Sequence, residues 1–126
     1  MKKHFVLSTL LLLFTILGNA QIKDTIIKKP VAIPKNFVAQ LDVVYTKVKD
    51  WDGRADLYLA LNENKPTPIL INIHGGGWKS GTKETQGGFS PFFKAGFAVA
   101  NMEYRMSGQA KAPAAIEDTR CMLVTR

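Results

Sequence analysis

The stretch that decides the fold reads Ile69-Leu70-Ile71-Asn72-Ile73-His74-Gly75-Gly76-Gly77-Trp78. Its first five residues are apolar at all positions but one, which is typical of a strand covered on both faces of a sheet. Three consecutive glycines follow, and without a Cβ they let the backbone turn sharply and bare its N–H groups. We therefore predict a central strand at residues 69–73 that ends in a glycine-rich turn.

The residues after this turn predict a helix and a second buried strand. Ser90 is a suitable N-cap, Pro91 suits the first helical position, and Gly96 could close the helix. Residues 97–102 are another short apolar run. Strand, loop, helix and strand in this order form a βαβ unit, whose two strands should be parallel.

Two more strands are predicted on the N-terminal side of this unit. Residues 40–48 are rich in β-forming side chains, and residues 56–61 alternate with a period of two, as expected for a strand with one buried face. The segment Trp51-Asp52-Gly53-Arg54 contains an Asp-Gly pair, a strong turn signal. The two strands should therefore form an antiparallel hairpin.

A helix is expected from Pro113 onward. Five residues fall three and four positions apart and would share one face of it, namely Ala115, Ile116, Thr119, Met122 and Leu123. An antiparallel hairpin that leads into parallel βα units predicts an α/β domain over residues 40–126. Four strands alone would leave apolar surface exposed, so this sheet needs further strands.

The N-terminus has the features of a secretory signal. Two lysines precede a thirteen-residue apolar run at residues 5–17, and small residues lead up to a cleavage site at Ala20–Gln21. The run is shorter than the roughly 20 apolar residues of a spanning helix, so no stable membrane anchor should remain after cleavage. We expect a signal peptide at residues 1–20, an extended lead-in at 21–39, and a secreted or periplasmic protein.

Charge and cysteine content narrow the function classes. The formal net charge is +7, and loss of Lys2 and Lys3 with the signal would leave +5. The lysines are scattered with no arginine-rich face, so nucleic acid is not an expected partner. Cys121 is the only cysteine, which excludes an internal disulfide and suggests that it packs as a small apolar side chain.

The glycine-rich turn has several possible uses, of which a plain turn is the simplest. A phosphate-binding loop needs Gly directly before Lys-Ser, where Trp78 stands, and a dinucleotide fingerprint needs a third Gly where Ser80 stands. No cofactor and no metal is predicted. The position at the carboxyl end of a buried strand, where open α/β sheets bind ligands, instead favours N–H donors aimed at an oxygen that becomes negative during acyl transfer.

Four ordered motifs carry a resemblance to a known family. They are Asp56-Leu57-Tyr58-Leu59, His74-Gly75-Gly76-Gly77-Trp78, Glu103-Tyr104-Arg105-Met106-Ser107 and Pro113-Ala114-Ala115-Ile116-Glu117-Asp118. Over residues 40–126 the chain resembles the start of α/β-hydrolase esterases of the hormone-sensitive-lipase-like, feruloyl/acetylxylan esterase group. The resemblance implies the N-terminal portion of an α/β-hydrolase sheet, with the C-terminal half missing.

The resemblance also implies roles for the residues of the turn. Backbone N–H groups of Gly75 and Gly76 would form the oxyanion hole, Gly77 and Trp78 would shape the pocket, and His74 would be structural. Family members commonly have Asp where Glu103 stands. Trp78 and Phe89 could each line a pocket wall or be core contacts.

The catalytic triad of this group is not found in the sequence. Such enzymes use a serine in G-x-S-x-G, then an acid, then a histidine. Gly88-Phe89-Ser90-Pro91-Phe92 fails at Phe92, neither Ser80 nor Ser107 fits, and His4 would leave with the signal. We therefore expect an inactive N-terminal fragment of a secreted serine esterase, whose full-length parent acts on a small-molecule or polysaccharide ester. The alternative is a non-catalytic secreted remnant or binding module.

Overall fold

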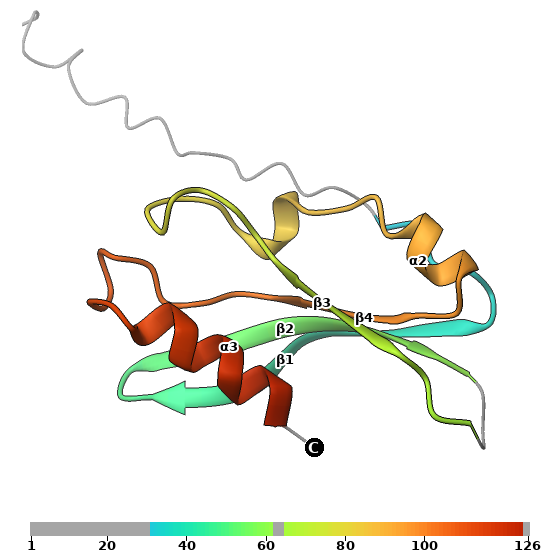
Figure 1. Ribbon diagram of the computed structural model, residues 1–126, viewed down its shortest axis with the longest axis horizontal. Coiled ribbons are helices and arrows are strands. Elements are labelled where there is room, and N and C mark those ends of the chain that lie inside the picture. Colours follow the sequence, from blue (N-terminus) through green and yellow to red (C-terminus); the bar gives the residue numbers. More distant parts are fainter. Residues whose placement is uncertain (1–30, 62–64, 125–126) are drawn as a thin grey trace, which may run out of the picture.

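The computed structural model describes residues 31–61 and 65–124. The expected signal peptide, residues 1–20, and most of the expected lead-in lie outside the described residues. The elements in chain order are β1 (Phe37–Val48), β2 (Trp51–Ala60), β3 (Ile69–Ile73), the 3₁₀ turn η1 (Lys83–Thr85), α2 (Ser90–Lys94), β4 (Ala98–Met102) and α3 (Ala114–Val124) (Figure 1).

The four strands form one mixed sheet in the order β1-β2-β4-β3. β1 pairs antiparallel with β2, β2 pairs antiparallel with β4, and β3 pairs parallel with β4. The predicted hairpin and the predicted parallel βαβ unit are both confirmed. The fold is therefore the α/β arrangement expected for the N-terminal part of a larger sheet.

The central position in the sheet belongs to β4 and not to β3. Every residue of β4 is buried, whereas Ile69 and Ile73 of β3 are 52% and 49% exposed. The prediction that residues 69–73 form a strand covered on both faces is therefore wrong for the described residues. The reason is strand order: β4 lies between β2 and β3, so β3 has a neighbouring strand on one side only.

The hairpin turn lies three residues before the predicted one. It is formed by Lys49 and Asp50, with Lys49 in the left-handed region (φ 53°), while Trp51-Asp52-Gly53-Arg54 already belongs to β2. Gly53 pairs with Thr46, and a Cβ on Gly53 would lie 2.7 Å from Thr46 Cγ2. The glycine therefore permits close packing across the hairpin and does not make the turn.

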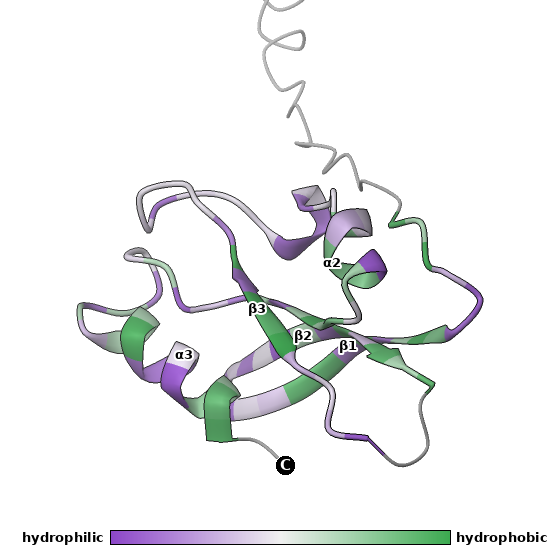
Figure 2. Cartoon of the chain, turned by 45° about the vertical axis from the view of Figure 1, so that its right-hand side comes forward, coloured by the Kyte–Doolittle hydropathy of each residue, from purple (hydrophilic) through white to green (hydrophobic). Residues whose placement is uncertain are grey.

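Each face of the sheet carries its own apolar cluster. The cluster beneath α2 contains Phe37, Tyr58, Phe89, Phe93 and Val99. The cluster beneath α3 contains Tyr45, Ala55, Ala100, Met102, Tyr104 and Met122. Figures 1 and 2 show the two helices on opposite sides of the sheet. The single buried face predicted for residues 56–61 is therefore wrong, because β2 contributes to both clusters.

The start of β1 also extends further than expected. Phe37, in the predicted lead-in of residues 21–39, is a strand residue and is 7% exposed. Its ring packs at a tilt against Phe93, with centroids 4.9 Å apart. The last three residues of that segment thus belong to the sheet, and Phe37 belongs to its core. Backbone pairing to Ala60 continues the β1–β2 ladder to this point.

Helix α3 buries only part of its predicted face: Met122 is buried and Ala115 packs against the core as predicted, but the centre of the face lies elsewhere. Its buried residues are Ala114, Asp118 and Met122, whereas Ile116 and Leu123 are 64% and 66% exposed. The cause is Arg105, whose Nη2 and backbone N–H donate to the Asp118 carboxylate at 2.7 and 2.9 Å. This ion pair turns Asp118 inward, and Cys121 packs beside the same cluster as expected.

The remaining helix is a single turn. Phe89 occupies the N-cap position of α2 and Ser90 is its first residue, so the predicted N-cap is displaced by one position. Gly96 follows the helix with φ 83°, which agrees with the predicted closing glycine. Across residues 31–61 and 65–124, no helix is long and apolar enough to cross a bilayer.

Candidate functional site

The glycine loop, defined here as residues 74–82, connects the carboxyl end of β3 to η1. Three consecutive residues have positive φ: Gly76 (121°), Gly77 (59°) and Trp78 (60°). A Cβ on Gly76 would lie 1.8 Å from the Ser80 carbonyl oxygen, so only glycine fits there. Trp78 is a bulky residue in a region that costs roughly 1–2 kcal/mol, which marks the loop as strained.

The loop leaves a row of backbone donors without acceptors. Gly76 O accepts the N–H groups of Lys79 and Ser80 at 3.1 and 3.2 Å. By contrast, the N–H groups of residues 75–78 donate no hydrogen bond to any described part of the chain, and these four residues are exposed. An external oxygen could therefore accept hydrogen bonds from them.

A cavity of about 460 Å³ lies between the glycine loop and α3. Its lining residues are Ile73, His74, Gly75, Gly77, Trp78, Tyr104, Ala115, Ile116, Thr119 and Arg120. Gly76 lies between two lining residues of the loop without lining the cavity itself. The walls are mostly apolar, and the exposed Arg120 supplies the one cationic side chain of the lining.

The sequence left the roles of Trp78 and Phe89 open, and the structure places them in different environments. Trp78 is 65% exposed and lines both this cavity and a neighbouring one of about 390 Å³. Phe89 is 4% exposed and packs in the cluster beneath α2, on the other face of the sheet. Trp78 is thus a wall residue, and Phe89 is a core contact.

His74 is enclosed on every side. Its side chain has no exposed surface, its ring stacks on Tyr104 with centroids 4.4 Å apart, and its carbonyl accepts the Tyr104 hydroxyl at 2.9 Å. Nδ1 lies 2.9 Å from the Gly75 carbonyl, which can only accept, so Nδ1 carries the hydrogen. Neither ring nitrogen is open to a substrate, and this geometry suits a structural histidine.

Sequence reasoning missed a buried ion cluster behind the loop. Lys83 is 3% exposed, and its ammonium lies 2.8 Å from Asp42 Oδ1, 2.8 Å from Asp56 Oδ1 and 3.0 Å from Glu84 Oε1. Burial alone would lower the pKa of Lys83, but hydrogen bonds to the three carboxylates outweigh it and raise that pKa. Burial alone would raise the pKa of Glu84. Hydrogen bonds, first among them the one from Lys83, outweigh burial and hold that pKa below its ordinary value.

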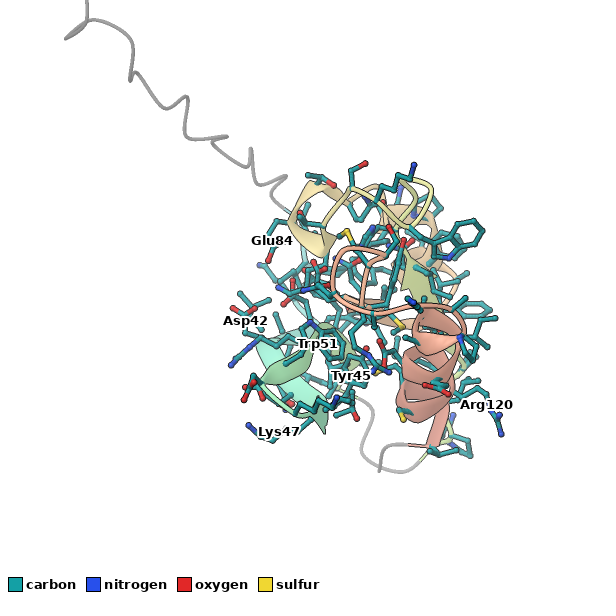
Figure 3. All side chains as sticks on the ribbon, turned by 90° about the vertical axis from the view of Figure 1, so that its left-hand side faces the viewer. Asp42, Tyr45, Lys47, Trp51, Glu84 and Arg120 are labelled. Atoms are coloured by element: carbon teal, nitrogen blue, oxygen red, sulfur yellow. The ribbon has the colours of Figure 1, made fainter. Side chains whose placement is uncertain are left out.

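The same lysine anchors the end of the glycine loop through its backbone. Its N–H donates to Glu103 Oε1 at 2.5 Å, and its carbonyl accepts Asn101 Nδ2 at 2.9 Å. Figure 3 shows the labelled Asp42 and Glu84 on one side of the molecule and Arg120 on the other, pointing outward from α3. The loop is therefore fixed to β4 and to the hairpin from behind, with its front left to the cavity.

A metal site is not apparent in the part of the chain that the structure describes. No group of three His, Cys, Asp or Glu side chains is arranged there to hold an ion. The carboxylates that do gather, at residues 42, 56 and 84, face the Lys83 ammonium.

Comparisons with known proteins point to esterases. The BD-FAE family model matches residues 55–124. Among curated proteins, the versiconal hemiacetal acetate esterase of Dothistroma septosporum is 33% identical over 96 residues, which are 72% of this chain and 27% of that protein.

Solved structures agree with this assignment. A truncated form of a carbohydrate esterase from gut microbiota aligns with a TM-score of 0.61 at 26% identity, covering 75% of this chain and 34% of that one. A bacterial heroin esterase aligns with a TM-score of 0.53 at 29% identity, covering 71% and 29%. The chain thus spans about a third of the length of the relatives that it matches.

Proposed function

Because the chain belongs to the BD-FAE family and shares its fold with α/β-hydrolase esterases, we propose that its glycine loop is the oxyanion-binding part of a serine-type carboxylic ester hydrolase. The observation that carries the proposal is the row of N–H groups at residues 75–78, which find no acceptor among the described residues and lie beside an apolar cavity. When a nucleophile attacks an ester, the carbonyl oxygen becomes an anion, and each placed donor can lower the barrier by roughly 3 kcal/mol. Gly75 and Gly76 are assigned as the donors.

The proposal divides the chemistry between this loop and groups outside it. His74 is buried against Tyr104 and hydrogen-bonded to Gly75, so it does not act as the base. On this proposal the 126-residue chain stabilises charge but does not hydrolyse esters alone. Hydrolysis of p-nitrophenyl acetate by this chain, abolished by a serine-directed inhibitor, would contradict that part.

The proposed substrate of the complete enzyme is a small-molecule or carbohydrate ester. The matched relatives are named for esters of these kinds. The mostly apolar walls of the cavity, including Ile73 and Ile116, suit the acyl group of such an ester, since apolar surface favours apolar ligands.

The oxyanion role can be tested on this chain by NMR. Diethyl phosphate is tetrahedral and carries one negative charge shared by two oxygens, so it mimics the charged intermediate of ester cleavage. We expect it to bind with a Kd on the order of 1 mM and to move the amide proton resonances of Gly75 and Gly76 downfield, while those of Gly88 and Gly96 stay in place.

Two controls distinguish anion binding by the glycine loop from a general attraction of anions to the protein. Triethyl phosphate is also tetrahedral at phosphorus but carries a third ethyl group in place of the charge, and it should cause no such shifts. Arg120→Gln removes the cation of the cavity lining and should leave the glycine shifts in place, with weaker binding. If the shifts disappear with Arg120, or if Gly75 and Gly76 never respond, the oxyanion assignment is refuted.

We also propose that the protein is exported. The support is the order of basic, apolar and small segments in residues 1–20. N-terminal sequencing of protein collected from the periplasm or medium should begin at Gln21. A mature protein that begins at Met1 and stays in the cytoplasm would contradict this.

A further inference from the structure

We propose that Glu103 is a positioning residue that, through His74, sets the direction of the Gly76 N–H. The proposal deepens the function proposed above and rests on it. It concerns a carboxylate behind the glycine loop that touches neither the cavity nor a substrate. Its side chain is 22% exposed and meets both ends of the glycine loop.

The backbone of Glu103 is fixed by the hairpin. Its N–H donates to the Arg54 carbonyl at 2.9 Å, and its carbonyl accepts the Tyr45 hydroxyl at 2.6 Å. The side chain then extends toward the loop, where Oε1 accepts the Lys83 N–H and Oε2 lies 3.4 Å from His74 Nε2. Glu103 therefore connects the rigid sheet to the residues that begin and follow the loop.

Three neighbours confine the His74 ring, and Glu103 lies against its Nε2 edge. Tyr104 fixes the plane of the ring, and Gly81 packs so closely that a Cβ there would lie 2.7 Å from Nδ1. Nε2 is buried and makes no hydrogen bond within residues 31–61 and 65–124. The Glu103 carboxylate lies 3.4 Å from Nε2 and thus prevents the ring from moving away from the Gly75 carbonyl, so that Nδ1 stays in contact with that carbonyl.

That contact determines where the Gly76 N–H points. The peptide between Gly75 and Gly76 is planar and trans, so its C=O and N–H point in opposite directions. His74 Nδ1 draws the Gly75 carbonyl inward at 2.9 Å, and the Gly76 N–H must then point outward. Glu103 thus holds the His74 ring, the ring holds the Gly75 carbonyl, and the carbonyl sets the direction of the Gly76 N–H.

The length of Glu103 matters more than its charge. Glutamine has the same side-chain length as glutamate, and its planar amide has the shape of the carboxylate. Glu103→Gln should therefore keep the contacts with Lys83 and His74. Aspartate is one methylene shorter, so at this backbone position its carboxylate should lie farther from the Lys83 N–H and from His74. Alanine opens space behind Nε2 and lets the ring withdraw from the Gly75 carbonyl.

The test uses the ligand-free chain uniformly labelled with ¹⁵N, in a His4→Gln background that leaves His74 as the only histidine. Glu103→Ala should move the His74 Nδ1 and Gly76 amide resonances and speed exchange of the Nδ1 hydrogen at least tenfold. Glu103→Asp should shift the same resonances by less, and Glu103→Gln should restore both. Glu84→Gln, which loses a bond to Lys83 but none to His74, is the matched control and should leave both in place.

Binding adds a second readout. Diethyl phosphate should bind about tenfold more weakly to the Glu103→Ala chain and with unchanged affinity to Glu103→Gln. If Glu103→Ala does not fold, the Asp and Gln variants carry the comparison. Unmoved His74 and Gly76 resonances in both the Ala and Asp variants would overturn this inference, whereas a wild-type chain that ignores diethyl phosphate would overturn the proposed function.

Discussion

Replacing Gly76 with alanine is expected to destabilise the chain by about 3 kcal/mol. The added Cβ would lie 1.8 Å from the Ser80 carbonyl oxygen, and the φ of 121° is unfavourable for any residue with a side chain. Backbone strain and overpacking each cost roughly 1–3 kcal/mol. Urea unfolding followed by tryptophan fluorescence, compared with the unsubstituted chain, would measure the loss.

The neighbouring glycine provides a matched control. A Cβ on Gly75 would meet no heavy atom within 4 Å, and its φ lies outside the left-handed region. Gly75→Ala should therefore change the free energy of unfolding by no more than about 0.5 kcal/mol. Similar losses for the two variants would show that the loop conformation around Gly76 is not as described.

Replacing Lys83 with methionine is expected to cost about 3 kcal/mol. The variant keeps the length of the side chain but leaves the Asp42, Asp56 and Glu84 carboxylates without their shared cation. Removing one partner of a buried ion pair typically costs 3–5 kcal/mol, and we take the low end because the Asp42 side chain is 56% exposed and partly screened by water.

Two further measurements make this prediction specific. Lys79→Met removes an exposed lysine from the glycine loop that precedes Lys83 and should change stability by less than about 0.5 kcal/mol. Because the pKa of Glu84 is lowered from 4.5 in the fold, its charge stabilises the chain above that pH and the contribution is lost as the pH falls. Lys83→Met should flatten this acid-side loss, and an unchanged pH profile would argue against the cluster.

The elements of the fold were predictable because their signals are local. Alternation and apolar runs identified the four strands, and the Gly and Pro positions bounded α2 and α3 within a few residues. Strand order was not predictable in this way. The apolar run at residues 69–73 gives no sign that residues 98–102 would take the central place, because that choice depends on contacts between distant segments.

Charged residues caused the error in the buried face of α3 and the omission of the cluster around Lys83. Arg105 draws Asp118 inward and rotates α3 away from the face that its apolar spacing favours. The cluster around Lys83 joins side chains from β1, β2 and η1, so no short motif contains it. Asp56 was the available signal, since a carboxylate directly before the apolar run at residues 57–61 needs a partner if it is buried.

Part of the candidate site was likewise predictable from local sequence, and part of it was not. The glycines were recognisable because a backbone site depends on the absence of side chains, which a sequence displays directly. The parts that hold the loop, namely Glu103 and Lys83, act through distances that only the folded chain creates. Their importance could not be read from their immediate neighbours.

The one-sided pairing of β3 has a geometric consequence. On its outer side the strand offers a row of backbone donors and acceptors, and neighbouring strands in a sheet run about 4.8 Å apart. A partner strand added there in the same direction as β3 would end level with Ile73. A side chain that followed the partner strand would then lie beside the Gly75 amide. Two separate chain segments would thus come together at this end of the sheet.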